Sequence, residues 1–326
     1  MTIDEVLAIL LREKDFVSGE AISSQIGVSR AAVNSAVKAL KAVGCEIESV
    51  TNKGYRITFC PDRLYAGEVY SYLTPERCRS VVCLPSAGST NNVLKEKLKE
   101  NPPEGTCVIA NEQTGGRGRM GRTFISPSDT GIYMSILLHP QGNIADIGEI
   151  TAWTAVAVRN AIHSACGIDT DIKWVNDIYA GGLKVAGILT EMSVEGEIGL
   201  ISNVIVGIGI NVNQKQADFP DEIAETATSL SAFSGIPSLS RARLAAEIIR
   251  EMDLLMDRWP GAKAAYLDTY RKNCITLGKE VTITNYATGS SVSGYALDIN
   301  SDFSLKVRYP DGSVDDVRSG EVSARL

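Results

Sequence analysis

The chain has 326 residues, of which 44% are hydrophobic and 22% charged, so it is long enough for two or three domains and typical of an ordinary globular protein. A formal net charge of −7 argues against a protein that binds nucleic acid with its whole surface, and any such contact must be a local patch. The chain has seven cysteines, an odd number, without a Cys-x-x-Cys pair, which argues against a disulfide framework or a zinc site. The acidic N-terminus argues against a signal peptide, and the lack of a long apolar run argues against a membrane segment. We therefore expect a cytoplasmic protein.

Residues 1–63 have the pattern of a small separate module of helices and a hairpin. Apolar spacing predicts three helices, with Ser18 and Ser29 as N-caps of the second and third, and with Gly27 ending the second. Two alternating runs around Asn52-Lys53-Gly54 then predict a hairpin. Two helices joined by a tight turn and followed by a hairpin are typical of a winged helix-turn-helix.

The outward side chains of the third predicted helix are donors suited to bases and phosphates, with no acidic residue among them. The candidate DNA-binding residues are Ser29, Arg30, Asn34, Lys38 and, at the tip of the hairpin, Lys53. A helical protein-interaction domain whose basic face is merely solvated is the alternative. The hairpin that follows the third helix favours DNA binding.

Residues 64–80 have a mixed helical pattern, and we expect them to form a linker helix. From residue 81 to 272, strand-like runs and helical patterns follow one another without regular alternation, which favours an α+β domain over a doubly wound sheet. The segment 147–166 is apolar enough to predict a long helix that is buried against the sheet.

A loop rich in glycine and arginine stands out in this central region. Gln113 follows one predicted strand, and the run Gly116–Arg122 alternates arginines with glycines before the next strand. Glycine lets the backbone approach a ligand closely, and the guanidinium fork fits carboxylates and phosphates. The loop therefore predicts an anion site, although such runs also occur in flexible nucleic-acid-binding segments.

Three further clusters carry polar side chains at strand ends. Ser89-Thr90-Asn91 opens a predicted helix, where capping is the simpler interpretation and ligand binding the alternative. Lys173 and Asp177 could form a structural ion pair or bind an anion. Lys184 follows a Gly-Gly turn at the start of an apolar strand, which suits an edge lysine as well as a catalyst. Because no common catalytic set is present, an enzyme of this sequence would work by positioning and electrostatics.

Residues 273–326 contain short strands separated by turns, and Pro310-Asp311-Gly312 is a strong turn signal. This pattern predicts a small SH3-like β-barrel. Its role is open between a packing module and a contribution to ligand and partner binding.

The order of the motifs resembles that of the biotin protein ligase family. The resemblance rests on Gln113–Arg122, Lys173–Asp177, Lys184–Leu189 with Glu191, and Gly207–Val212. Ser29–Asn34 and Asn52–Tyr55 resemble the DNA-binding domain of the bifunctional members of that family, which are also biotin operon repressors.

This resemblance implies a class II synthetase-like mixed sheet and a reaction in two steps. Biotin and ATP, with Mg²⁺, would give biotinyl-5′-AMP and pyrophosphate, and biotin would then pass to a lysine of the biotin carboxyl carrier domain of a carboxylase. Biotinyl-5′-AMP would also be the corepressor, so that the protein would bind operator DNA as a homodimer. No membrane partner is implied.

The resemblance also assigns residues to the site. Catalytic roles fall on Arg119, Lys184 and Asp177. The positions for biotin and the adenylate are Ser89, Thr90, Asn91, Gln113, Arg117, Gly118, Arg119 and Lys184. The positions near the nucleotide are Lys173, Asn176, Asn211 and Arg122. The metal ligands and the residue that covers adenine are not identified; Phe219, Leu230 and Phe233 are the candidates for the latter.

Three alternatives remain. A lipoate ligase would share the central fold, but its motifs are missing. A transcription factor that senses biotin without ligating it is disfavoured by Arg119 and Lys184. A ligase whose N-terminal domain has lost DNA binding is distinguished only by an operator-binding assay.

Overall fold

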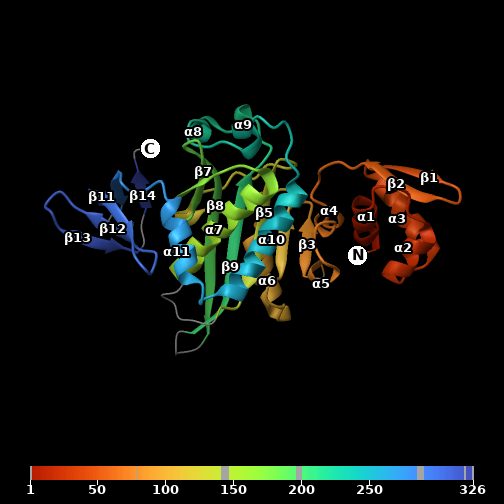
Figure 1. Cartoon of the computed structure of the whole chain (residues 1–326), viewed down its shortest axis with the longest axis horizontal. Coiled ribbons are helices and arrows are strands. Elements are labelled where there is room, and N and C mark those ends of the chain that lie inside the picture. Colours follow the sequence, from red (N-terminus) through yellow and green to blue (C-terminus); the bar gives the residue numbers. More distant parts are fainter. Residues whose placement is uncertain are drawn as a thin grey trace.

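The structure is a computed structural model that describes residues 2–78, 80–140, 147–195, 200–284, 290–318 and 321–324. Three parts follow one another along the longest axis (Figure 1). The N-terminal module lies at one end, a large domain built on a central sheet lies in the middle, and a smaller C-terminal sheet lies at the other end. Within the described residues, no helix is long and apolar enough to cross a membrane.

The N-terminal module has the predicted order of elements: α1 (Thr2–Arg12), α2 (Gly19–Ile26), α3 (Arg30–Ala42), β1 (Glu46–Val50) and β2 (Gly54–Phe59). Both predicted N-caps are confirmed, because Ser18 Oγ accepts from Ala21 N at 3.0 Å and Ser29 Oγ accepts from Ala32 N at 3.2 Å. Gly27 ends α2 in the left-handed region, at φ +70°. Apolar side chains of the three helices and the hairpin form one core for this module.

The expectation of one linker helix over residues 64–80 is wrong. The segment contains two short helices, α4 (Ala66–Tyr70) and α5 (Pro75–Cys78). Proline has no amide hydrogen to donate and its fixed φ suits the first helical position, so Pro75 begins a new helix instead of continuing the old one. Gly67 lets α4 approach α1 closely, since a Cβ there would lie 2.5 Å from Asp4 O.

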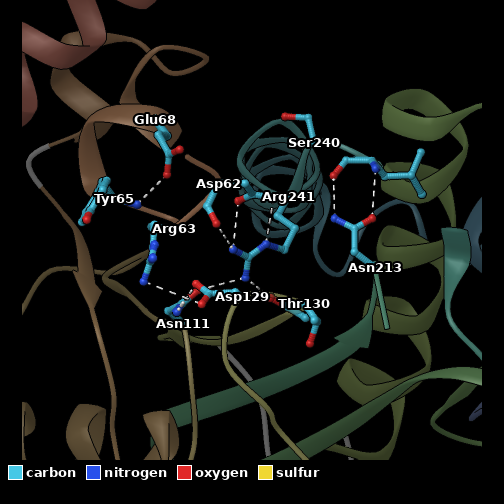
Figure 2. Close-up of polar contacts among 12 residues, drawn as sticks. Asp62, Arg63, Tyr65, Glu68, Asn111, Asp129, Thr130, Asn213, Ser240 and Arg241 are labelled. Atoms are coloured by element: carbon cyan, nitrogen blue, oxygen red, sulfur yellow. Dashed lines mark hydrogen bonds and ion pairs between the residues drawn. The ribbon is translucent and has the colours of Figure 1, made fainter. Parts of the chain in front are cut away.

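The junction between the module and the central domain is built around Arg241, whose side chain is fully buried (Figure 2). Arg241 Nε donates to Asp62 Oδ2 at 2.9 Å, and Nη2 donates to the Asp62 carbonyl at 2.7 Å. Nη1 donates to Asn111 Oδ1 at 2.9 Å and to the Gly131 carbonyl at 3.0 Å. Arg63 lies 3.7 Å from Asp129 beside this cluster. One guanidinium therefore joins the end of the module to two segments of the central domain.

The central sheet has the order β3-β4-β5-β9-β8-β7-β6. Its strands are β3 (Val81–Leu84), β4 (Cys107–Ala110), β5 (Gly131–Leu138), β6 (Asp171–Lys173), β7 (Asp177–Ala180), β8 (Leu183–Glu195) and β9 (Leu200–Asn211). The β3–β4 pair is parallel and the other pairs are antiparallel, so the sheet is mixed and the α+β prediction is confirmed.

Helices cover both faces of this sheet. The helices of the central domain are α6 (Thr90–Lys97), α7 (Ile147–Cys166), α8 (Asp221–Ala224), α9 (Leu230–Ser234), α10 (Arg241–Arg258) and α11 (Lys263–Lys272). Leu94 of α6 packs with Val108, Leu137 and Ile205. The neighbouring residues of these strands belong instead to the large core with α7 and α10. Because successive side chains of a strand point to opposite faces, α6 covers one face, and α7 and α10 the other. The predicted burial of 147–166 is confirmed.

The sequence run Lys173–Asp177 is divided between two strands. β6 ends at Lys173, and β7 begins at Asp177. Residues 174–176 form a turn between them, and the β6–β7 hairpin places Lys173 opposite Asp177. This hairpin brings both residues to the end of the sheet.

The C-terminal part is an antiparallel sheet in the order β13-β12-β11-β10-β14. Its strands are β10 (Glu280–Thr284), β11 (Ser291–Ile299), β12 (Leu305–Arg308), β13 (Val314–Val317) and β14 (Glu321–Ala324). The pairings that close an SH3-like barrel are not found among the described residues. Trp174 Nε1 donates to the Phe303 carbonyl at 2.9 Å, which ties this sheet to the central domain next to the β6–β7 turn.

Candidate active site

A cavity of about 350 Å³ opens at one end of the central sheet. It gathers every residue that the sequence assigned to biotin, the adenylate, the nucleotide or catalysis. These are Ser89, Thr90, Asn91, Gln113, Arg117, Gly118, Arg119, Arg122, Lys173, Asn176, Asp177, Lys184 and Asn211. Residues that are more than 100 positions apart in the chain thus share one site. The volume of the cavity lies at the lower end of the usual range for small-molecule pockets, about 300–1,000 Å³.

Glycines on β8 and β9 form the floor of the cavity. A Cβ on Gly207 would lie 2.4 Å from Asn91 Oδ1, and a Cβ on Gly209 would lie 2.6 Å from the Phe124 ring. Ile208 between them points into the large core on the other face. The alternation of the strand therefore requires glycine on the cavity side, because any other side chain would displace Asn91 and Phe124 from the site.

The start of α6 provides one polar end of the site. Ser89 occupies the N-cap position, but its side chain makes no capping hydrogen bond, so the capping interpretation of this residue is wrong. Gln113 Oε1 accepts from the Thr90 amide at 2.9 Å instead, and Gln113 Nε2 donates to Ser126 Oγ at 3.2 Å. Ser89 is nonetheless only 5% exposed and lines the cavity, so its hydroxyl is placed to meet a ligand.

Ser135 lies beneath this end and was not identified from the sequence. Its side chain is fully buried on β5, and Oγ lies 2.7 Å from Thr90 Oγ1 and also contacts Asn91 Oδ1. A serine in the middle of an apolar strand was the signal for it. Ser135 fixes the orientation of both side chains and so acts through them.

Glu191 of β8 holds the glycine/arginine loop. It accepts from Asn91 Nδ2 at 2.7 Å and from Lys95 Nζ at 2.8 Å, and Arg117 Nη2 lies 3.2 Å away. Burial raises the pKa of Glu191, but hydrogen bonds from Lys95 and Asn91 and the charge of Arg117 outweigh burial and leave its pKa below the ordinary value. The carboxylate is therefore ionised and positions Arg117, which also donates to Asn92 Oδ1 at 2.7 Å.

The opposite end of the site contains an ion pair and a lysine over a ring. Asp177 Oδ1 lies 2.7 Å from Lys184 Nζ, so Lys184 takes the place beside Asp177 that the sequence offered to Lys173. Lys173 Nζ lies 5.4 Å from the centroid of the Tyr179 ring. Both lysines line the cavity, together with Arg119.

Arg119 is oriented by the turn between β6 and β7. Its Nη1 donates to Asn176 Oδ1 at 3.1 Å, and Asn176 Nδ2 donates to the Ile188 carbonyl at 2.9 Å. Arg117, Arg122 and the two lysines stand around the same cavity, so cationic donors converge from two strands and a loop. This arrangement stabilises negative charge on a bound carboxylate or phosphate.

An apolar wall closes the remaining side. Of the three aromatic or apolar candidates for covering adenine, Phe219 lines the cavity and is 9% exposed. Leu230 is fully buried, and Phe233 is 46% exposed and packs against Gly181. Val322 of β14 also lines the cavity, so the C-terminal sheet contributes directly to the site.

The candidate DNA-binding residues lie on the separate N-terminal module. Asn34 and Lys38 are exposed on α3, and Lys53 is exposed at the hairpin tip, 5.8 Å from the centroid of the Phe16 ring. Arg30 lies 3.5 Å from Glu20, with most of its side chain in solvent. The Ser29 hydroxyl is used as the N-cap of α3. The structure thus places four of the five candidates on one helix and its wing, with side chains free for a partner or in a weak surface pair.

Comparisons with known proteins agree with this division. A model of the biotin/lipoate A/B protein ligase family matches residues 84–211, and a model of an HTH domain matches residues 3–56. The bifunctional ligase/repressor BirA of Bacillus subtilis is 42% identical over 222 residues, which is 68% of each chain. The protein of the same name from Escherichia coli is 30% identical over 273 residues, covering 83% of this chain and 82% of that one.

A solved structure shares the architecture. The biotin protein ligase from Aquifex aeolicus in complex with biotin and ATP superposes with a TM-score of 0.64 at 28% identity. The match covers 75% of this chain and 98% of that chain.

Proposed function

Since this chain belongs to the biotin/lipoate A/B protein ligase family, we propose that it is an ATP-dependent biotin protein ligase that also represses transcription. The observation that carries the ligase half is the convergence of Arg117, Arg119 and Lys184 with the polar start of α6 in one cavity. The repressor half rests on the helix-turn-helix module and on relatives whose names include both activities.

In the first step, the carboxylate of biotin attacks the α-phosphate of ATP and pyrophosphate leaves. Two anions must approach each other, so their repulsion has to be offset by preorganised donors. We assign Arg119 and Lys184 to stabilisation of the charge that develops on the α-phosphate, and Arg117 to binding of the carboxylate. Asp177 holds the Lys184 ammonium at 2.7 Å and so fixes its direction.

The amides and hydroxyls at the start of α6 suit the ureido ring of biotin, which needs both donors and acceptors. Ser89, Thr90, Asn91 and Gln113 provide both kinds of group within the cavity. Asn176, Asn211, Lys173 and Arg122 are assigned to the nucleotide, with Phe219 packed against adenine.

The cavity also fits a Mg²⁺ ion that enters with ATP. Magnesium in such sites uses one or two carboxylates together with the phosphates and water, and the Asp177 carboxylate in the cavity is such a group. The ion would neutralise part of the phosphate charge. Among the described residues there is no cluster of three acidic, histidine or cysteine side chains that would hold a metal without ATP.

In the second step, a lysine amine of the biotin carboxyl carrier domain attacks the carbonyl of biotinyl-5′-AMP, and AMP leaves. Val322 supports a role of the C-terminal sheet at the nucleotide end of the site, and we assign this sheet the SH3-like fold. Biotinyl-5′-AMP is also proposed as the corepressor: an adenylate that binds the dimer better than the monomer shifts the chain to the dimer that binds operator DNA.

Biotin-dependent exchange between ATP and labelled pyrophosphate tests the ligase half, with lipoate as the competing substrate. Loss of one phosphate-facing donor should cost about 3 kcal/mol, so Arg119→Ala should lower exchange at least ~100-fold while the circular dichroism spectrum is unchanged. Arg250→Ala on α10 is the matched control, because Arg250 lies outside the cavity. Unchanged exchange in Arg119→Ala would refute the assignment.

Operator binding with and without biotin and ATP tests the repressor half. Gel-shift affinity that rises with both ligands, together with dimer formation in sedimentation, is the expected result. Exchange activity without any operator binding would favour the alternative of a ligase whose DNA-binding domain no longer functions.

A further inference from the structure

Two cysteines face each other at the base of the wing. Cys45 directly precedes β1 and Cys60 directly follows β2. The register of β1 and β2 pairs Glu46 with Phe59, so Cys45 and Cys60 are the next opposed positions of the hairpin. Opposed residues of an antiparallel pair lie about 4.5–5.5 Å apart at Cα, which is within the range that disulfides span.

The segments next to β1 and β2 remain in contact outside the hairpin. A Cβ on Gly44 would lie 3.3 Å from Pro61 Cγ, so the residues after the cysteine pair are also in contact. Cys45 is 3% exposed, Cys60 is half-buried, and both pack in the core of the N-terminal module. Their side chains therefore point to the same side of the hairpin and toward each other.

The two thiols are close enough for each to change the pKa of the other. A hydrogen bond from Cys60 lowers the pKa of Cys45, although burial of Cys45 opposes this, and the same hydrogen bond raises the pKa of Cys60. Such a pair titrates as a unit, in which the first proton leaves at a lower pH than the second. A thiolate shared by two adjacent sulfurs is the species that reacts with a disulfide.

The remaining cysteines do not share this chemistry. Burial raises the pKa of each of them, and they are Cys78, Cys83, Cys107, Cys166 and Cys274. All seven cysteines are free thiols. Selective oxidation is therefore expected at the wing and not in the central domain.

We propose that Cys45 and Cys60 are a redox-active dithiol that closes to an intramolecular disulfide on reaction with a low-molecular-weight disulfide. The shared proton first moves to the Cys45 sulfur, and the more accessible, half-buried Cys60 sulfur then attacks the small disulfide as the thiolate and releases one small thiol. Cys45 then attacks the Cys60 sulfur of this mixed disulfide and releases the second small thiol. The dithiol loses two electrons and two protons, and both small sulfurs are recovered as thiols.

The bond would close a loop that contains the whole wing, with Lys53 at its tip. Asp62, which the buried Arg241 holds against the central domain, lies two positions after Cys60 (Figure 2). The disulfide therefore lies at the point where the chain leaves the DNA-binding module. It would stabilise the folded module, because a cross-link restricts the unfolded chain within the loop that it closes. The catalytic cavity contains neither cysteine.

The test uses the full-length protein in buffers with different ratios of oxidised to reduced glutathione. Free thiols are then alkylated, and peptides are mapped by mass spectrometry without reduction. The expected product has lost two hydrogens and contains a peptide linked through Cys45 and Cys60, with the other five cysteines alkylated. The oxidised protein should unfold at a higher temperature in its N-terminal module and keep its biotin transfer rate.

Single variants separate closure from mere reactivity. Cys45→Ser should leave Cys60 as a stable mixed disulfide with one glutathione, and Cys60→Ser should form no adduct or cross-link at the wing. Cys78→Ser is the matched control and should close as the parent protein does. Closure is measured on protein with native circular dichroism, independently of ligase activity, so a failed ligase assignment would leave this result unaffected. Recovery of Cys45 as the alkylated thiol at every glutathione ratio, or a cross-link between other cysteines, would overturn the proposal.

Discussion

Replacement of Arg241 by methionine should strongly destabilise the junction between the N-terminal module and the central domain. Methionine retains most of the aliphatic volume but removes every donor of the guanidinium. Arg241 is fully buried and donates to Asp62, Asn111 and Gly131. The substitution therefore tests these hydrogen bonds more than the packing.

The magnitude follows from which acceptors lose their partner. Asn111 is 7% exposed and its Oδ1 would lose its donor, as would the Gly131 carbonyl. Each buried acceptor without a partner costs about 1–3 kcal/mol. The Asp62 carboxylate, whose side chain is 37% exposed, regains water and adds less. The free energy of unfolding should fall by about 3–5 kcal/mol in total, as in other buried pairs that lose one partner.

Thermal unfolding by calorimetry, with limited proteolysis of the 59–66 segment, measures this loss. A change of this size lowers the unfolding midpoint by roughly 10 °C for a domain of this length. Arg243→Met is the matched control on the same helix: Arg243 is exposed and makes one long hydrogen bond of 3.5 Å, so its loss should have little effect. Arg241→Met within about 0.5 kcal/mol of the parent protein would refute the reasoning.

Three further expectations concern other parts of the molecule. Glu191→Gln removes the charge that positions Arg117. In steady-state exchange assays we expect the KM for biotin to rise about tenfold, which corresponds to about 1.4 kcal/mol of binding free energy, with a smaller change in kcat. Burial, reinforced by the charge of Asp62, raises the pKa of Glu68 from 4.5 to about 7. The folded state therefore holds this proton more tightly than the unfolded state. The free energy of unfolding should fall by at most about 3 kcal/mol as pH rises from 4.5 through 7. In denaturation curves at pH 5 and 8, Glu68→Gln should abolish this fall. Lys53→Ala should weaken operator and non-specific DNA binding alike and reduce the slope of log affinity against log salt by about one, measured by fluorescence anisotropy.

Local features of the fold were predictable from the sequence because they depend on neighbouring residues. The N-caps at Ser18 and Ser29 and the left-handed Gly27 are examples, since each is decided within one helical turn. The break of the linker at Pro75 was also local, but the apolar spacing of the segment outweighed it in the prediction. Ser319-Gly320 is a turn signal directly before the final strand at 321–324, but the sequence could not show that this strand pairs with β10.

The membership of the site was predictable, but its internal contacts were not. Motif order named the residues that line the cavity, whereas periodicity could not show that Asp177 meets Lys184 or that Gln113 caps α6. These contacts depend on how β7, β8 and the loop before β5 are placed by the sheet. Ser135 was missed for the same reason, because its role is visible only once α6 lies over β5.

The position of Arg241 relates the two halves of the proposed function. Arg241 binds the Gly131 carbonyl, and Gly131 is the Cα partner of Asn211, which lines the catalytic cavity. The same guanidinium binds Asp62 at the end of the DNA-binding module. Replacement of Arg241 and its acceptors together by a packed apolar contact would stabilise the junction as well as the buried ion pair does, unlike the loss of Arg241 alone, so stability alone does not account for an arginine here. Its directed hydrogen bonds instead fix one register between the module and the strands at the end of the cavity that contains Asn211, which is what the proposed control of repression by an adenylate requires.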